Sequence, residues 1–440
     1  MSVTWTKEQQ QVIRLRERNL LVSAAAGSGK TAVLVERILH MISDPENPLD
    51  IDRLLVMTFT RAAAGEMKMR LTQALEEALE EQPENDHLQK QMNLVHSAQI
   101  TTIDGFCSYV IRNYFHTIGL EPGWRTADEG ELKLLKTDVV RELLEEEYAQ
   151  KRPEFLEFAE SYAPGKQDEE LEKWILKLYE FSMSNPWPRE WLQECVSTYQ
   201  AETYEELMQA SWMEPMWEDV QQNLKEARRI TGQALALTRE ADGPYMYEEA
   251  LASDLQAVEQ IEEAQKDYRQ IQRLLEGLSF ARLSAKKDAN VSQTAKEQVK
   301  NLRQQVKDIV KGLKEQYFAC TAEELLEILA LCRTPVEELV RLTLKFAEDF
   351  AEKKREKNIL DFSDMEHFAL DILVKRVDGR CEPTDAAREL SLKYEEILVD
   401  EYQDSNYVQE LLMTQVSGWA KEKNNIFMVG DIKQSIYRFR

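Results

Sequence analysis

Residues 20–31 read Leu20-Leu21-Val22-Ser23-Ala24-Ala25-Ala26-Gly27-Ser28-Gly29-Lys30-Thr31. A short apolar run leads into a loop of small residues with two glycines, then a Lys-Thr pair, and a helical pattern continues over residues 32–42. A bound triphosphate requires this order of strand, loop and helix, because the loop N–H groups and the helix N-terminus face the phosphates. The pattern predicts a P-loop.

Each part of this loop has an expected role toward ATP. The two glycines would let the backbone approach the phosphates closely, Lys30 would reach the β and γ phosphates, and the Thr31 hydroxyl would bind Mg²⁺. Ala24 stands where the strict pattern has glycine, so a chance small-residue loop that caps a helix is the alternative. The expected nucleotide-binding residues in the loop are Ala24, Ala25, Ala26, Gly27, Ser28, Gly29, Lys30 and Thr31.

Two further apolar runs end in polar residues far downstream. Residues 397–399 end in Asp400-Glu401-Tyr402-Gln403-Asp404. Ligand sites of open parallel sheets lie at the carboxyl ends of the strands, so we expect Asp400 to hold Mg²⁺ and Glu401 to orient and deprotonate the attacking water. A solvated acidic turn is the alternative. Residues 426–429 precede Gly430 and Gln434, and Gln434 would contact the γ-phosphate as an uncharged donor. An ordinary polar loop is the alternative there.

The distribution of patterns predicts one α/β domain that is split by a helical insertion. Short apolar runs at 19–23, 54–58, 397–399 and 426–429 alternate with helical patterns, which indicates a parallel sheet covered by helices. The middle of the chain is rich in Glu, Lys, Gln, Leu and Ala at helical spacing. We therefore predict a motor domain in two parts, 1–127 and 346–440, and a helical insertion over 128–345.

Composition excludes several other classes of protein. Hydrophobic residues make up 43% of the 440 residues and charged residues 31%, which is typical of a globular protein. No apolar stretch is long enough to span a membrane, and the first ten residues lack the apolar core of a signal peptide. Five scattered cysteines without a CxxC pair favour a reducing cytoplasm. The net charge of −25 argues against a nucleic-acid partner only weakly, because binding depends on where cations cluster.

Together the motifs resemble the superfamily-one DNA helicases of the UvrD/RecB type, and within them the AddA family of helicase–nuclease subunits. Besides the P-loop and the Asp400–Asp404 motif, the resemblance rests on the adenine-reading motif around Gln9 and on the run from Val429 to Arg440. Two further motifs, at 58–67 and 101–107, resemble DNA-contacting segments. Six motifs in the family's order make a specific signal over most of the chain.

The resemblance implies a RecA-like fold that binds ATP and Mg²⁺ and moves along DNA. Lys30, Glu401 and Gln434 would be catalytic, and Gln9 would read the adenine. The implied partners are single-stranded and duplex-end DNA and a partner subunit of the AddB type, in the recombinational repair of double-strand ends. By resemblance, the DNA-contacting residues are Phe59, Thr60, Arg61, Thr102, Tyr437, Phe439 and Arg440. Aromatic rings stack on bases of any sequence, while Arg and Thr hold phosphates; core packing is the alternative for Phe59 and Phe439.

The chain departs from the family pattern at three points. Asp104 occupies a position that is commonly His, and Ala32 follows the P-loop where relatives often carry Arg. The chain stops at Arg440, so the second motor domain and the nuclease domain of the family are missing from it. We therefore expect an N-terminal fragment that binds nucleotide weakly and turns it over slowly.

A basic ridge is predicted from the sequence alone. Cations recur at a spacing of three or four along a probable helix over 296–314, beside an apolar stripe. A solvated face that keeps the helix soluble is one interpretation, and contact with the phosphates of incoming duplex DNA is the other. The cations are Lys296, Lys300, Arg303, Lys307, Lys311 and Lys314.

Two other functions compete with the motor. A P-loop enzyme for a small molecule, such as a kinase, would need an acceptor pocket, for which the sequence offers no residues. A scaffold subunit with an inactive site conflicts with the intact set of Lys30, Thr31, Asp400, Glu401 and Gln434.

Overall fold

The computed structural model describes residues 5–25, 29–163, 168–418, 423–431 and 433. Its contacts divide the chain into two compact units, Met1–Leu192 with Arg341–Arg440, and Gln193–Val340. Residues 128–192 therefore group with the sheet-bearing unit, whereas their composition assigns them to the insertion. Packing joins this segment to the predicted second part of the motor domain, since the ring of Tyr179 lies 5.1 Å from that of Phe346 and 5.9 Å from that of Phe350.

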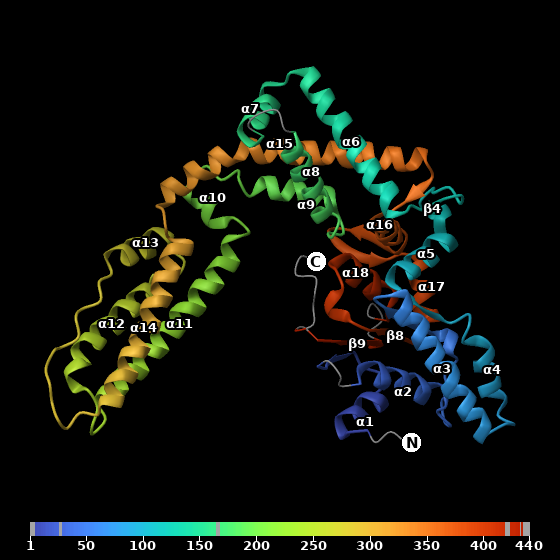
Figure 1. Ribbon diagram of the computed structural model, residues 1–440, viewed down its shortest axis with the longest axis horizontal. Helices are drawn as coiled ribbons and strands as arrows, with labels where there is room; N and C mark the ends of the chain where they lie inside the picture. The colour runs from blue at the N-terminus through green and yellow to red at the C-terminus, as the bar shows by residue number, and fades with distance from the viewer. Residues whose placement is uncertain (1–4, 26–28, 164–167, 419–422, 432, 434–440) are drawn as a thin grey trace. The chain divides into compact units, whose positions relative to one another are not determined.

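Among the described residues, a parallel sheet in the order β1-β9-β8-β2-β3 forms the centre of the first unit (Figure 1). Two strands from the end of the sequence, β9 and β8, lie between β1 and β2 from its beginning. The predicted α/β class with a parallel sheet is confirmed, although β3 is not among the predicted strands. The strands are β1 (Leu20–Ser23), β2 (Leu54–Thr58), β3 (Gln99–Thr102), β8 (Glu396–Val399) and β9 (Ile426–Gly430).

Helices cover both faces of this sheet. Leu54 and Val56 of β2 pack with the first helical layer, and Leu55 and Met57 pack with the second. This alternation follows from the two-residue period of a strand, and all five residues of β2 are buried. The first layer contains α2 (Lys30–Ile42), α3 (Arg61–Glu81) and α4 (Asp86–Leu94), and the second contains α5 (Ile103–Tyr114), α16 (Phe362–Leu373), α17 (Asp385–Lys393) and α18 (Tyr407–Val416).

The first unit contains further elements around this three-layer core. The short strands β4 (Arg125–Thr126) and β5 (Ile359–Leu360) pair in parallel, and β6 (Val374–Val377) and β7 (Arg380–Pro383) form an antiparallel hairpin. The remaining helices are α1 (Lys7–Arg14), α6 (Glu129–Gln150), α7 (Pro153–Tyr162), α8 (Glu169–Ser182), and parts of α9 (Pro188–Ser197) and α15 (Ala322–Glu356).

The second unit is helical and has its own core. Trp217, Tyr268 and Phe318 are buried in it, and the ring of Phe318 lies 6.2 Å from that of Trp217 and 4.9 Å from that of Tyr268. Its helices include α10 (Tyr204–Gln209), α11 (Met213–Thr238), α12 (Glu248–Glu263), α13 (Tyr268–Gly277) and α14 (Gln293–Tyr317).

The predicted basic ridge lies on α14, with one correction. Lys300, Lys311 and Lys314 are exposed, but Arg303 is 5% exposed and bonds Asp254 with its Nε at 2.6 Å and its Nη2 at 3.1 Å. The spacing of three or four residues assigns Arg303 to the solvent-facing cations. Its partner Asp254 lies on another helix, 49 residues away in sequence, so the spacing alone does not reveal their bond. Arg303 is therefore a structural residue of the core.

Candidate nucleotide site and the adjoining pocket

The carboxyl ends of β1, β8 and β9 bring the predicted nucleotide motifs together. The Ala24 N–H donates to the Gly430 carbonyl at 3.1 Å, which joins the start of the P-loop to the end of β9. The Asp400 N–H donates to the Met57 carbonyl of β2 at 2.9 Å. Residues 24, 400 and 430 thus meet at one edge of the sheet, where open parallel sheets place their ligand sites.

Lys30 and Glu401 form an ion pair at this edge. The Lys30 Nζ lies 2.9 Å from the Glu401 Oε2, and the side chain of Lys30 is only 9% exposed. Glu401 has left-handed backbone angles (φ 53°), which are uncommon for a residue with a side chain and are concentrated at functional sites. Burial opposes ionisation of Glu401, but hydrogen bonds from Gln403 and Lys30 outweigh it and lower its pKa.

Gln403 connects this ion pair to β9. Its amide nitrogen donates to the Glu401 Oε2 at 2.8 Å, while its Oε1 accepts from the Asp431 N–H at 2.9 Å. The bridge requires glycine at the end of β9, because a Cβ on Gly430 would lie 2.4 Å from the Gln403 Oε1. Gln403 belongs to the acidic motif, but no local pattern in the sequence assigns it a role.

The local chemistry fits a phosphate with a divalent cation. Gly29, in a left-handed conformation (φ 80°), precedes α2 and has no side chain to cap it, and the first turn of α2 carries Lys30 and no acidic residue. Such a helix start favours an anion. Asp400 is 8% exposed, and burial and the neighbouring Glu401 raise its pKa, so a cation beside it would restore its charged form. Within the described ranges, no cluster of three or more His, Cys, Asp or Glu side chains is arranged to hold a metal ion.

Gln9 lies beside the P-loop. Its side chain closes a capping box at the start of α1, in which the Thr6 N–H donates to the Gln9 Oε1 at 2.9 Å. A Cβ on Gly29 would lie 3.9 Å from the Gln9 amide nitrogen. Arg37 fixes α1 against α2, because it bonds Glu396 at 2.7 Å and also donates to the Val12 carbonyl near the end of α1.

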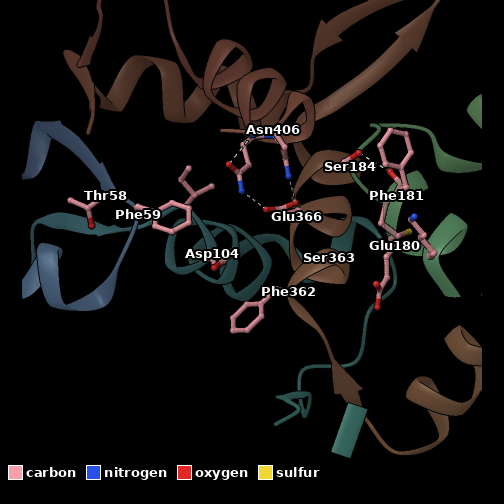
Figure 2. A pocket seen from close by; sticks show the side chains of 14 residues that line it. Thr58, Phe59, Asp104, Glu180, Phe181, Ser184, Phe362, Ser363, Glu366 and Asn406 are labelled. Atoms are coloured by element: carbon pink, nitrogen blue, oxygen red, sulfur yellow. Dashed lines mark hydrogen bonds between the residues drawn. The ribbon is translucent and has the colours of Figure 1, made fainter. Parts of the chain in front are cut away.

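A pocket of about 450 Å³ opens next to the ends of β2 and β3 (Figure 2). Phe59 from the segment after β2 lines it and is half-buried. Asp104 from α5 and Phe362 from α16 lie around the same space, as Figure 2 shows. The exposed ring of Phe181 also lines the pocket. Phe181 is not among the predicted site residues, because exposure of a helical aromatic residue is decided by tertiary packing.

The other predicted site residues lie at the ends of β2 and β3 or outside the described residues. Thr60 and Arg61 are exposed at the start of α3, where the Thr60 hydroxyl accepts from the Ala63 N–H. Thr102 is buried, and its hydroxyl accepts from the Gly105 N–H at the start of α5. The following predicted residues fall outside the described ranges: Ala26, Gly27, Ser28, Gln434, Tyr437, Phe439 and Arg440.

No helix in the described part of the chain is both long and apolar enough to cross a lipid bilayer.

Comparison with known proteins places this arrangement in a family. A profile of the UvrD/REP helicase N-terminal domain matches residues 5–440. Proteins named as the A subunits of ATP-dependent helicase/nucleases are similar over nearly the whole chain: 49% identity over 99% of this chain for one from Lachnoclostridium phytofermentans, 42% over 100% for one from Clostridium perfringens, and 39% over 99% for one from Bacillus pumilus. The chain covers 32%, 35% and 36% of these relatives, so it spans about a third of their length. Since the profile extends over almost every residue, the chain belongs to the UvrD/REP helicase N-terminal domain family.

Proposed function

We propose that the chain is the ATP-binding motor part of a helicase–nuclease that unwinds and processes the ends of double-stranded DNA. The observation that carries the proposal is the meeting of Lys30, Asp400 and Glu401 at one edge of a parallel sheet, beside an aromatic pocket. The names of the relatives support a helicase and nuclease as the whole protein.

Each residue of the edge has a distinct part in this proposal. Lys30 would hold the β and γ phosphates, Thr31 and Asp400 would hold Mg²⁺, and Glu401 would orient and deprotonate the attacking water. Gln434 would contact the γ-phosphate, and Gln9 would read the adenine. The nucleotide and its metal supply the transferable phosphoryl group and neutralise the charge on it. Mg²⁺ suits a site with few protein ligands, since it is commonly held by one or two carboxylates and by phosphate oxygens.

Single-stranded DNA would pass over the ends of β2 and β3. Phe59 and Phe362 offer aromatic faces at the pocket, and the exposed Arg61 offers a cation for the phosphates. Base stacking on aromatic rings tolerates any sequence, which suits a translocating motor. The exposed cations of α14 would meet the duplex ahead of the strand separation. An AddB-type subunit is the proposed partner, because the relatives are named as one subunit of an assembly.

The test is ATP hydrolysis with Mg²⁺, with and without single-stranded DNA, by the wild-type chain and by Lys30→Ala. We expect a slow basal rate that Lys30→Ala abolishes and that DNA raises little, because the family's second motor domain would supply the other half of the site. A rate that Lys30→Ala leaves unchanged would contradict the proposed active site. Strong stimulation by DNA would show that this chain closes its own site.

A further inference from the structure

The Gln403 amide lies between the acidic turn after β8 and the end of β9. Its nitrogen donates to the Glu401 Oε2 at 2.8 Å and to the Asp404 Oδ2 at 3.4 Å, and its oxygen accepts from the Asp431 N–H at 2.9 Å. A reversed amide would turn its oxygen toward two carboxylates and its nitrogen toward an N–H donor. These partners therefore fix the orientation of the amide.

The two carboxylate oxygens of Glu401 differ in what they bond. Among the residues that the structure describes, Oε2 accepts from the Lys30 Nζ at 2.9 Å and from the Gln403 Nε2 at 2.8 Å, whereas Oε1 accepts from no side chain or backbone group. A carboxylate oxygen has about two acceptor positions, so Oε2 is occupied and Oε1 is available. The Glu401 side chain is 36% exposed, which lets a water molecule reach it.

The two donors to the Glu401 Oε2 would respond differently to ATP. Lys30 would leave this oxygen, because the proposed site places its ammonium group on the β and γ phosphates. Gln403 would stay, because its amide is uncharged and its oxygen is held by the Asp431 N–H. The terminal torsion of a glutamate side chain has only weak preferences, so the carboxylate needs this remaining donor to keep its orientation.

We infer that Gln403 is a positioning residue for ATP hydrolysis, which holds the Glu401 Oε2 so that Oε1 faces the attacking water. The inference rests on the proposed function and gives a role to a residue that had none in it. In the reaction the water oxygen bonds the γ-phosphorus while the bond from that phosphorus to the ADP oxygen breaks. ADP leaves with the electron pair, and the water proton passes to Oε1. Gln403 acts only through Glu401.

The first experiment compares ATP hydrolysis with Mg²⁺ by the wild-type 440-residue chain and by Gln403→Met, which keeps the length of the side chain and removes its hydrogen bonds. We expect kcat to fall about 10- to 100-fold, the usual effect of losing a hydrogen bond to a charged group. KM should stay unchanged, because the interaction matters in the transition state and not in binding. An unchanged kcat would overturn the inference.

Gln403→Glu separates donation to Glu401 from the bridge to β9. Glutamate keeps the shape of the side chain and can still accept from the Asp431 N–H, but its carboxylate cannot donate to Glu401. We therefore expect kcat to fall at least as far as in Gln403→Met. If Gln403→Glu hydrolyses ATP like the wild-type chain, then Gln403 merely connects the ends of β8 and β9.

A double-mutant cycle tests whether the effect passes through Glu401. Glu401→Gln alone should slow hydrolysis, and the addition of Gln403→Met should slow it no further. A second, additive loss in the double variant would show that Gln403 acts on the site by another route, and would overturn the inference.

Gln91→Met is the matched control, because Gln91 makes the same kind of bridge away from the nucleotide site. Its amide donates to the Asp50 Oδ1 at 2.6 Å and accepts from the Ile51 N–H at 2.8 Å, before β2 begins. This variant should lower the melting temperature and leave kcat unchanged below that temperature. A fall in kcat equal to that of Gln403→Met would attribute both losses to folding.

A crystal structure of the wild-type chain with Mg²⁺ and a non-hydrolysable ATP analogue tests the geometry without turnover. We expect Lys30 on the phosphates, the bond from Gln403 to the Glu401 Oε2 intact, and a water molecule on Oε1. A broken bond between Gln403 and Glu401 would overturn the inference while the proposed function stands. A chain that neither binds nor hydrolyses ATP would overturn the proposed function and the inference with it.

Discussion

Lys30 and Gln403 converge on one carboxylate oxygen of Glu401. The Lys30 ammonium group lies 2.9 Å from the Glu401 Oε2, and the Gln403 amide donates to the same atom at 2.8 Å. In the proposed reaction Lys30 acts on the phosphates and Glu401 on the water. The ion pair therefore links the residue proposed to bind the phosphates to the residue proposed to activate the water. A substitution at either residue should alter the other.

Glu401→Gln should separate nucleotide binding from hydrolysis. The substitution removes the negative charge that holds Lys30, so Lys30 becomes more available to phosphates and ATP should bind at least as tightly. Hydrolysis should fall by about 10²–10⁴-fold, the usual contribution of a general base. Binding of a fluorescent ATP analogue and the rate of phosphate release measure the two effects. Glu395→Gln, whose carboxylate pairs with Lys423 and Arg53 before β8 begins, is the control and should change neither.

Gly430→Ala should disrupt the nucleotide site by displacing Gln403. Because the new Cβ would lie 2.4 Å from the Gln403 Oε1 and 3.2 Å from its backbone nitrogen, Gln403 must move away from Glu401 and Asp431. We expect a loss of about 1–3 kcal/mol in the free energy of unfolding, and a slower ATP hydrolysis.

Gly65→Ala is the matched control for that variant. Gly65 lies inside α3, and outside the neighbouring backbone of that helix nothing lies within 4 Å of a Cβ placed there. Alanine in a helix interior is favoured over glycine by roughly 0.5–1 kcal/mol, so the control should raise the melting temperature. Equal melting temperatures and hydrolysis rates for the two variants would contradict the packing described at Gly430.

Arg303→Met should destabilise the second unit, because it leaves the buried carboxylate of Asp254 without its partner. Removing one member of a buried pair costs about 3–5 kcal/mol. Hydrogen exchange of the α14 amides, followed by mass spectrometry, reports on this unit separately from the first. Adding Asp254→Leu should recover much of the loss. If Arg303→Met exchanges like the wild-type chain, then Arg303 belongs to the solvent-facing ridge.

Reversing the exposed charges of α14 should weaken the binding of duplex DNA. Lys300→Glu, Lys311→Glu and Lys314→Glu together remove three cations without touching Arg303. If all three meet phosphates, the slope of log affinity against log salt should fall by roughly three, at about 0.9 per contact. An unchanged slope would assign these lysines to a solvated face that has no DNA role.

Protonation of Glu147 should make the first unit less stable in acid. Burial of its side chain opposes ionisation, but Arg341, Lys345 and Arg152 outweigh that effect and lower its pKa below the ordinary 4.5. A lowered carboxylate pKa contributes stability above pH 4.5 that is lost as the pH falls through the folded-state value. Glu147→Gln should therefore lower the melting temperature near neutral pH, and the difference from wild type should shrink as the pH falls below 4.5 and through the lowered pKa of Glu147. Glu145→Gln, on the exposed side of α6, should show no such pH dependence.

Local patterns in the sequence predict the parts of this fold that neighbouring residues determine. Apolar runs mark β1, β2, β8 and β9, and the motifs at their ends mark Lys30, Asp400 and Glu401. Strand β3 escapes prediction because Gln99–Thr102 contains a single strongly apolar residue, Ile100.

Contacts between residues distant in sequence were beyond prediction. The burial of Arg303 depends on Asp254, and the bridge from Gln403 to the Asp431 N–H depends on how β9 lies beside β8. The pocket combines α5, α8, α16 and the end of β2, so neither its rings nor its carboxylates form a motif.

The position of the late strands β8 and β9 between the early strands β1 and β2 determines when the sheet can be completed during biosynthesis. β1, β2 and β3 leave the ribosome first, but β1 lacks its neighbour β9, and β2 lacks β8, until more than 300 further residues have been made. At roughly 5–20 residues per second, this interval lasts about 15 to 65 seconds. During it the apolar strands of the motor would have unpaired edges, while the helical unit of Gln193–Val340 could already form its own core. The nascent chain should therefore depend on chaperones most strongly just before β8 emerges.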